Sequence, residues 1–389
     1  MVRGAIKVKV LIATDCYTFQ TGGITTVVIA LEKGLREKGH EVKVLALSNT
    51  RKSYREGDSY YVGSLPFPDY PEHRFTLNLK DPLVAELIAW KPDLIHMHTE
   101  FTICRLGKYI ARKTGAPIVM TTHTDFEYFN FGRFRNTAFV TWLGKSWGKG
   151  VYKEAVKVIV PSVKAKSFAH LLPHQDKVVV IPNGIETERY RKPVSAEEKK
   201  ALFDQAGFTD SGHTLVMITR LSKEKNVIEI LRYMPSLIRI VPDVQLVIVG
   251  DGPDRKRLEK FTGDYDLKSH VRFTGRIDPK EVYKYYNLGD VFVSASLFEL
   301  HSMSYLEAMS VGLPLVCRED MSLRGVLDDG VNGYIYETEQ EFAEKTARLL
   351  NDKDVLEKMS REAYKKADET DVGHFIENTL ALYESVRKQ

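Results

Sequence analysis

Cysteine is scarce in this chain: among 389 residues there are three, Cys16, Cys104 and Cys317. Their number is odd, and no two of them have the short spacing of a zinc-binding pair. We therefore expect reduced thiols, with neither a disulfide framework nor a metal site.

Long apolar runs are missing as well. No uninterrupted apolar stretch approaches the roughly 20 residues of a membrane-spanning helix, and the N-terminal sequence Met-Val-Arg-Gly-Ala-Ile-Lys is too polar for a signal peptide. The sequence therefore predicts a cytoplasmic protein. It also lacks a Gly-x-Ser-x-Gly elbow and a Cys-His nucleophile signature, so hydrolytic chemistry is not indicated.

The apolar residues that are present, 43% of the chain, suffice for more than one core. Short β-rich runs alternate with stretches of helical periodicity, which is the pattern of parallel sheets covered by helices on both faces. The composition turns charged between Glu186 and Asp210, where we place a linker. The sequence thus predicts an α/β fold with two Rossmann-like, doubly wound domains, residues 1–185 and 186–371, and a final helix in 372–389 that crosses back to the first domain.

The formal net charge of +4 hides an asymmetry. Residues 1–185 hold 26 Lys and Arg against 16 Asp and Glu, a charge of +10, whereas residues 186–389 hold 30 against 36, a charge of −6. The basic half fits an anionic partner, and charge alone does not separate nucleic acid, an anionic membrane and anionic substrates.

Two carboxylates, Glu299 and Glu307, stand in the stretch Phe298–Ala308, which follows a strand-like run and opens a helix. Backbone N–H groups at a helix start bind anions such as phosphate, and carboxylates accept hydrogen bonds from hydroxyls. This pattern favours a ligand that carries both phosphate and hydroxyl groups. The spacing of Ser304 and Glu307 also fits a capping box, in which Glu307 only satisfies backbone donors.

Other predicted strand ends carry glycine or basic residues. The pair Gly22–Gly23 precedes the first helix, where either the close approach of a phosphate or a tight turn explains glycine. Arg220 and Lys225 precede a helix start, where cations oppose the helix dipole unless an anion is bound. Gly250 and Arg276 end the next two strands. Because ligands collect beyond the carboxyl ends of parallel strands, we expect a nucleotide site at these loops.

Histidines mark strand ends in the first half of the chain, with His96 and His98 at one strand and His123 at another. A lone histidine is usually structural. Three of them at strand ends facing the expected cleft favour a role in the site, and they lack the helical spacing of a zinc site.

The segment Tyr128–Lys153 has five basic residues, no acidic residue and eight aromatic residues. Read as a helix from about Phe139, the segment has one apolar face, with Lys145, Lys149 and Lys153 roughly opposite. The residues that share the apolar face are Phe139, Trp142, Leu143, Trp147 and Val151. This is typical of an interfacial helix on an anionic membrane, and the alternative is an ordinary amphipathic helix packed on its own domain. The residues assigned to an acceptor or membrane surface are Arg133, Arg135, Phe139, Trp142, Lys145, Trp147 and Lys149.

The order and spacing of these motifs resemble the retaining GT-B glycosyltransferases of family GT4, and the resemblance covers nearly the whole chain. It rests on Gly22–Gly23, Gly39–Val44, Ile181–Ile185, Arg220 with Lys225, Val249–Pro253, and Glu299 with Glu307. Within that family, Ile95–Phe101, Thr122–Asp125 and the segment Tyr128–Lys153 are similar to bacterial 1,2-diacylglycerol 3-glucosyltransferases, and phosphatidylinositol mannosyltransferases share much of this pattern.

The resemblance implies a GT-B fold with two domains facing a central cleft, and a hexosyltransferase that works without a metal. Glucose would pass with retention from a UDP-sugar to diacylglycerol on the inner face of the cell membrane. The rival interpretations are a GT4 enzyme that acts on a saccharide or small molecule, and a GT-B protein without catalysis that serves as a binding subunit.

The resemblance also implies roles for single residues. Arg220 and Lys225 would bind the donor diphosphate, Glu299 the donor sugar and Glu307 the ribose, and His123 would lie by the transferring sugar and the acceptor. Ser302 stands where many family members have glycine, and its Cβ needs room, which leaves sugar specificity open. The other implied positions are Gly22, Gly23, Gly250, Arg276, Ser302, Met303 and Ser304 for the donor, and Asp15 for the acceptor.

Overall fold

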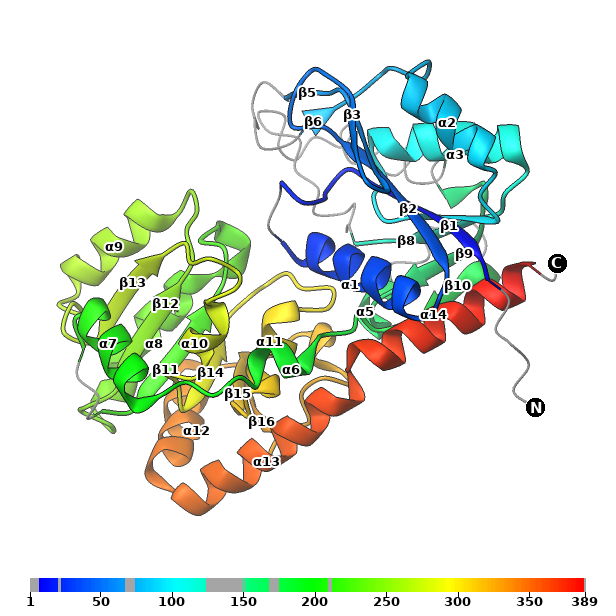
Figure 1. Cartoon of the computed structure of the whole chain (residues 1–389). Helices are drawn as coiled ribbons and strands as arrows, with labels where there is room; N and C mark the ends of the chain where they lie inside the picture. Colours follow the sequence, from blue (N-terminus) through cyan, green and yellow to red (C-terminus); the bar gives the residue numbers. More distant parts are fainter. Residues whose placement is uncertain are drawn as a thin grey trace. The chain divides into compact units, whose positions relative to one another are not determined.

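The computed structural model describes residues 7–19, 22–66, 74–123, 150, 152–167, 175–208 and 212–387. The chain forms two compact units. Unit 1 comprises Met1–Gly184 together with Val372–Gln389, and unit 2 comprises Ile185–Asp371. Each unit is an α/β layer structure built on its own largely parallel sheet, so the predicted fold class is confirmed (Figure 1).

Unit 1 has, within its described residues, an eight-stranded sheet in the order β10-β9-β8-β7-β1-β2-β4-β3, parallel except for the pair β3 and β4. Its central strands are buried along nearly their whole length because helices cover both faces. The strands are β1 Lys9–Thr14, β2 Glu41–Leu47, β3 Tyr54–Glu56, β4 Ser59–Val62, β7 Leu94–Met97, β8 Ile118–Thr121, β9 Ala155–Val160 and β10 Val178–Val180.

The helices of unit 1 include one from the far end of the chain. They are α1 Gly23–Glu37, α2 Pro82–Trp90, α3 Thr102–Thr114, α5 Val163–Ser167 and α14 Val372–Arg387, with a 3-10 turn at Gln175–Lys177. The short strands β5 Leu65–Pro66 and β6 Arg74–Phe75 pair with each other.

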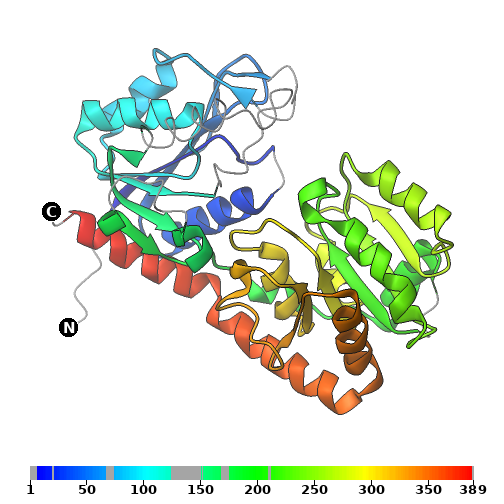
Figure 2. The same ribbon diagram turned by 180° about the vertical axis from the view of Figure 1, so that it is seen from behind.

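The C-terminal helix α14 lies along α1, as Figures 1 and 2 both show. A Cβ added to Gly34 of α1 would lie 2.5 Å from Cγ1 of Ile376, so glycine permits this close approach. From α14, Tyr383 also reaches His96 on β7, with 2.6 Å between its hydroxyl and Nδ1. The last helix is therefore an integral part of unit 1.

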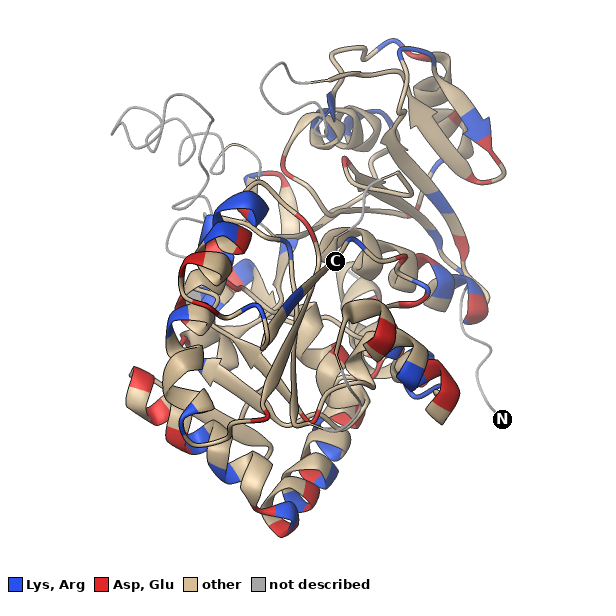
Figure 3. Ribbon diagram, turned by 90° about the vertical axis from the view of Figure 1, so that its left-hand side faces the viewer, with Lys and Arg blue, Asp and Glu red and all other residues tan. Residues whose placement is uncertain are grey.

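Unit 2 has, within its described residues, a six-stranded parallel sheet in the order β13-β12-β11-β14-β15-β16. Strands β11, β12 and β14 carry no charged residue, and Figure 3 shows the charges mainly on helices and loops. The strands are β11 Thr214–Ile218, β12 Gln245–Val249, β13 Val271–Gly275, β14 Val291–Ser294, β15 Leu315–Arg318 and β16 Gly333–Tyr336. The helices are α6 Thr187–Tyr190, α7 Ala196–Ala206, α8 Val227–Ile238, α9 Arg255–Asp264, α10 Val282–Tyr286, α11 Met303–Ser310, α12 Glu339–Asn351 and α13 Lys353–Glu369, with 3-10 turns at Lys223–Lys225 and Met321–Leu323.

The stretch between Glu186 and Asp210 is not the linker that its charged composition predicted. Most of it is helical and belongs to unit 2, where Phe203 packs in a small apolar cluster. Helix α7 begins with a capping box, because the Ser195 hydroxyl accepts from the N–H of Glu198 and the Glu198 carboxylate accepts from the N–H of Ser195. This local signal outweighs composition.

Candidate functional site

The loops after β11, β12 and β13 are tied together by backbone hydrogen bonds. The N–H of Leu221 donates to the carbonyl of Asp251 at 3.0 Å, and the N–H of Gly250 donates to the carbonyl of Gly275 at 2.9 Å. Gly250 has φ +136°, and a Cβ there would lie 1.9 Å from the carbonyl oxygen of Thr219. Loop packing therefore explains the glycine at 250, whose predicted donor contact stays a prediction.

Lys225 and Glu299, predicted as separate contacts of one donor, form an ion pair. The Lys225 Nζ lies 2.6 Å from Oε1 of Glu299, and their side chains are 23% and 13% exposed. The N–H of Leu297 donates to the carbonyl of Glu224 at 3.0 Å and joins the loops that carry them. The pair can meet a ligand that offers both an anion and a hydroxyl.

The start of α11 has the N–H groups that an anion could bind. Ser302 is the N-cap, but its side chain makes no capping bond and contacts the Ser304 hydroxyl at 3.0 Å. Its φ of −75° and ψ of 118° are ordinary for serine, so the backbone here does not demand glycine. Met303 and Ser304 form the first helical positions, whose N–H groups lack partners within the helix.

Glu307 does not close a capping box, which corrects that alternative. Its Oε1 accepts a hydrogen bond from Tyr190 at 2.8 Å, and its Oε2 accepts one from Tyr286 at 2.6 Å. Burial raises the pKa of Glu307, and the two tyrosine hydrogen bonds oppose that rise. No local pattern predicts these two tyrosines, because neither lies near Glu307 along the chain.

Arg220 and Arg276 are exposed residues at the carboxyl ends of β11 and β13. They lie at the same edge of the sheet as Lys225 and the start of α11, because the strands are parallel. Unit 2 therefore gathers its predicted donor residues at one sheet edge.

In unit 1, Gly22 and Gly23 begin α1. Gly22 has an extended backbone, with φ 164°, and among the described residues nothing lies within 4 Å of a Cβ added there. The backbone of Gly22 therefore does not itself require glycine.

Asp15 stabilises the start of α3. Its carboxylate accepts hydrogen bonds from the hydroxyls of Thr99 and Thr102 and from the N–H groups of Thr102 and Ile103, at the start of α3. Burial raises its pKa, and these hydrogen bonds oppose the rise. Its role toward an acceptor stays a prediction.

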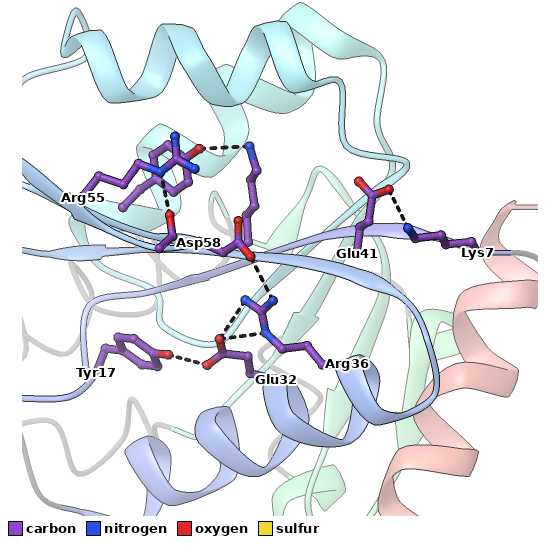
Figure 4. Close-up of polar contacts among 10 residues, drawn as sticks. Lys7, Tyr17, Glu32, Arg36, Glu41, Arg55 and Asp58 are labelled. Atoms are coloured by element: carbon purple, nitrogen blue, oxygen red, sulfur yellow. Dashed lines mark hydrogen bonds and ion pairs between the residues drawn. The ribbon is translucent and has the colours of Figure 1, made fainter.

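Tyr17, which follows Asp15 in the loop after β1, is fixed to α1. Its hydroxyl donates to Glu32, which also pairs with Arg36, and Arg36 reaches Asp58 at 3.0 Å (Figure 4). The loop that leads to the glycine pair is thus anchored to α3 by Asp15 and to α1 by Tyr17.

The three histidines do form one cluster. His96 contacts Tyr383 and, at 2.7 Å, the Thr121 hydroxyl, while Nδ1 of His98 lies 3.2 Å from Nε2 of His123. Burial lowers the pKa of His96 to about 3 and that of His123 to about 4, and it lowers the pKa of His98 strongly. All three imidazoles are neutral at pH 7, and His98 Nε2 is buried without a partner among the described residues.

The predicted acceptor or membrane surface lies outside the described residues. This concerns Arg133, Arg135, Phe139, Trp142, Lys145, Trp147 and Lys149. No helix in the described part of the chain combines the length and apolar character needed to cross a bilayer.

Comparison with known proteins assigns both units. Residues 21–189 match the family Glycosyltransferase Family 4, and residues 198–366 match the family Glycosyl transferases group 1. The α-monoglucosyldiacylglycerol synthase of Acholeplasma laidlawii is 26% identical over 365 residues, which cover 91% of each chain. The synthase of the same name from Streptococcus pneumoniae is 29% identical over 336 residues, covering 85% of this chain and 75% of that one.

Solved structures share the fold. Anabaena HepE in complex with UDP-glucose aligns with a TM-score of 0.74 at 20% identity, covering 97% of this chain and 100% of that one. Sucrose-phosphate synthase from Thermosynechococcus elongatus aligns with a TM-score of 0.76 at 17% identity, covering 97% and 98%. The two family matches cover both units, and each unit contains its own α/β sheet. The chain therefore belongs to the group 1 glycosyltransferases of family GT4, has the GT-B fold, and is a nucleotide-sugar-dependent hexosyltransferase.

Proposed function

We propose that this enzyme transfers glucose from UDP-glucose to diacylglycerol with retention, at the inner face of the cell membrane. The proposal of diacylglycerol as the acceptor is supported by the similarity, along 91% of both chains, to a synthase named for α-monoglucosyldiacylglycerol. A second synthase of that name, from another organism, supports the same acceptor.

The donor roles are assigned to the sheet edge of unit 2. Arg220 and Lys225 bind the diphosphate together with the N–H groups at the start of α11, around Ser302. Glu299, held beside Lys225, accepts hydrogen bonds from the sugar hydroxyls, and Glu307 accepts those of the ribose. Gly22 is assigned to the close approach of the donor phosphates, and among the described residues nothing lies within 4 Å of a Cβ added there.

The reaction builds negative charge on the leaving diphosphate. The acceptor oxygen bonds to the anomeric carbon on the face that the diphosphate leaves, the carbon–oxygen bond to phosphate breaks, and the acceptor's proton passes to a phosphate oxygen. Fixed cations and helix N–H groups stabilise this charge as it develops, so Lys225 and Arg220 supply the electrostatic part of catalysis. No metal is needed for this step.

His123 is assigned to the transferring sugar and the acceptor. Because burial keeps its pKa at about 4, it meets hydroxyl groups as a neutral imidazole that can accept a hydrogen bond. The charge of +10 on residues 1–185 supports an anionic membrane as the surface from which the lipid is taken.

A panel of nucleotide sugars and acceptors tests this function. The enzyme is incubated with UDP-glucose, UDP-galactose or GDP-mannose, and with diacylglycerol in anionic vesicles or with soluble saccharides, and the products are identified by mass spectrometry. The expected product is glucosyl-diacylglycerol. Products confined to the aqueous phase would refute the lipid acceptor, and the absence of turnover with every donor would favour a binding subunit.

A further inference from the structure

Within the part of the chain that the structure describes, two phenols and no cation hold Glu307. Tyr190 and Tyr286 are 3% and 0% exposed, and each bonds a different oxygen of the carboxylate. Among the described residues, no Lys, Arg or His lies within ion-pair distance of Glu307, although Arg189 lowers its pKa from further away. Such a clamp fixes the carboxylate plane without neutralising its charge.

The clamp leaves acceptor capacity unused. An ionised carboxylate has about four lone-pair positions, two on each oxygen, and the phenols occupy one on each. Glu307 remains partly exposed. Each oxygen thus keeps one lone pair that no other described residue takes, and this suits a pair of neighbouring hydroxyls, which is what the 2′ and 3′ positions of a ribose present.

Both tyrosines are themselves anchored. The guanidinium of Arg191, the residue after Tyr190, donates to the carbonyl of Ser310 at 3.3 Å and pairs with Asp368 at 2.6 Å, which clamps α6 to α11 and α13. The ring of Tyr286 packs edge-on against that of Tyr190, with 6.0 Å between centroids. The phenols are therefore placed by packing before any ligand arrives.

We propose that Tyr190 and Tyr286 are positioning residues that orient Glu307 to bind both ribose hydroxyls, and so make the enzyme select ribonucleotide over deoxyribonucleotide donors. This inference rests on the proposed assignment of Glu307 to the ribose. It adds the residues that fix the carboxylate and the discrimination that follows, because a site built around two hydroxyls loses a hydrogen bond when one is missing.

The test measures discrimination, which a purely structural role would not change. Isothermal titration calorimetry gives the Kd of UDP and of 2′-deoxy-UDP for the full-length enzyme and for the variants Tyr286→Phe and Tyr190→Phe. Tyr336→Phe is the matched control, because Tyr336 is equally buried and bonds the carboxylate of Glu229 at 3.1 Å. Each variant deletes one phenol hydroxyl that bonds a glutamate.

The wild type and Tyr336→Phe are expected to bind UDP about 10- to 100-fold more tightly than 2′-deoxy-UDP, the range of a hydrogen bond to a charged group. In Tyr286→Phe the ratio is expected to fall several-fold, mainly through weaker binding of UDP. Loss of the Tyr286 hydrogen bond also raises the pKa of Glu307 further. When the pH is lowered, Glu307 of this variant is therefore protonated earlier, and UDP binding should begin to weaken at a higher pH than in the wild type.

The outcomes separate the inference from the proposed function. A wild type that discriminates, together with a Tyr286→Phe variant that folds and discriminates equally, overturns the positioning role alone. A wild type that binds both nucleotides equally removes the ribose assignment of Glu307 and with it this inference. If Tyr286→Phe does not fold, Tyr190→Phe decides, and unchanged discrimination there contradicts the inference.

Discussion

Replacing Lys225 by methionine tests the charge pair at the centre of the proposed donor site. With 2.6 Å between Lys225 Nζ and Glu299 Oε1, the gross attraction is about 6 kcal/mol at an effective dielectric constant of about 20. Desolvation of both side chains offsets most of this, which leaves roughly 1–3 kcal/mol of net stability. We expect Lys225→Met to lower the stability of unit 2 by this amount.

The catalytic loss should be larger than the loss of stability suggests. Without the Lys225 ammonium, the leaving diphosphate loses a fixed cation, and removal of one such stabilising group typically lowers kcat by about 100- to 1000-fold. Steady-state kinetics with varied UDP-glucose measures kcat and KM, and thermal unfolding measures stability. We expect the variant to be folded at the assay temperature, with kcat reduced by about 100-fold or more.

The matched control is Lys223→Met. Lys223 is exposed on the same 3-10 turn as Lys225 and has no assigned role in the site. Its replacement changes the charge of the loop by the same amount and should leave kcat within about threefold of the wild type. If Lys225→Met loses stability but keeps the kcat of Lys223→Met, then Lys225 is a structural partner of Glu299 and the donor assignment fails.

Three further predictions concern the two units separately. Tyr383→Phe should destabilise unit 1 by roughly 1–2 kcal/mol in urea unfolding, because the buried Nδ1 of His96 loses its partner; an unchanged midpoint would contradict this. Burial lowers the pKa of His123 from 6.5 to about 4. The stability of the folded protein is therefore complete above pH 6.5 and should fall as the pH drops toward 4. Melting temperatures that stay flat across that window would refute burial as the cause of the low pKa. Gly250→Ala should lower the free energy of unfolding by roughly 1–3 kcal/mol or more through backbone strain. Gly22→Ala should leave that free energy unchanged and weaken the binding of UDP. Equal stability of the two variants would contradict the packing argument for Gly250.

The fold followed from periodicity because buried parallel strands are short, continuous apolar runs. β12, Gln245–Val249, and β14, Val291–Ser294, are such runs, and nearly all of their residues are apolar and buried. The charged composition of 186–210 wrongly predicts a linker, because charged residues are also common on exposed helix faces. The capping box of Ser195 and Glu198 was readable in the sequence and marks the start of α7.

The candidate site could be predicted only as a set of separate residues at strand ends. Parallel topology implies that loops after neighbouring strands meet, and Lys225 and Glu299 do meet although 74 positions separate them. Their direct ion pair does not follow from topology alone. The hydrogen bond from Tyr190 to Glu307 spans 117 positions and that between His96 and Tyr383 spans 287, and no local pattern specifies such contacts.

The central claim is transfer of glucose to a lipid with retention of configuration. The most direct measurement is the NMR anomeric signal of the lipid product formed from UDP-glucose and diacylglycerol in anionic vesicles. The proposed same-face reaction predicts an α-linked glucosyl-diacylglycerol. A β-linked product, or UDP release without any glycosylated lipid, would contradict the account.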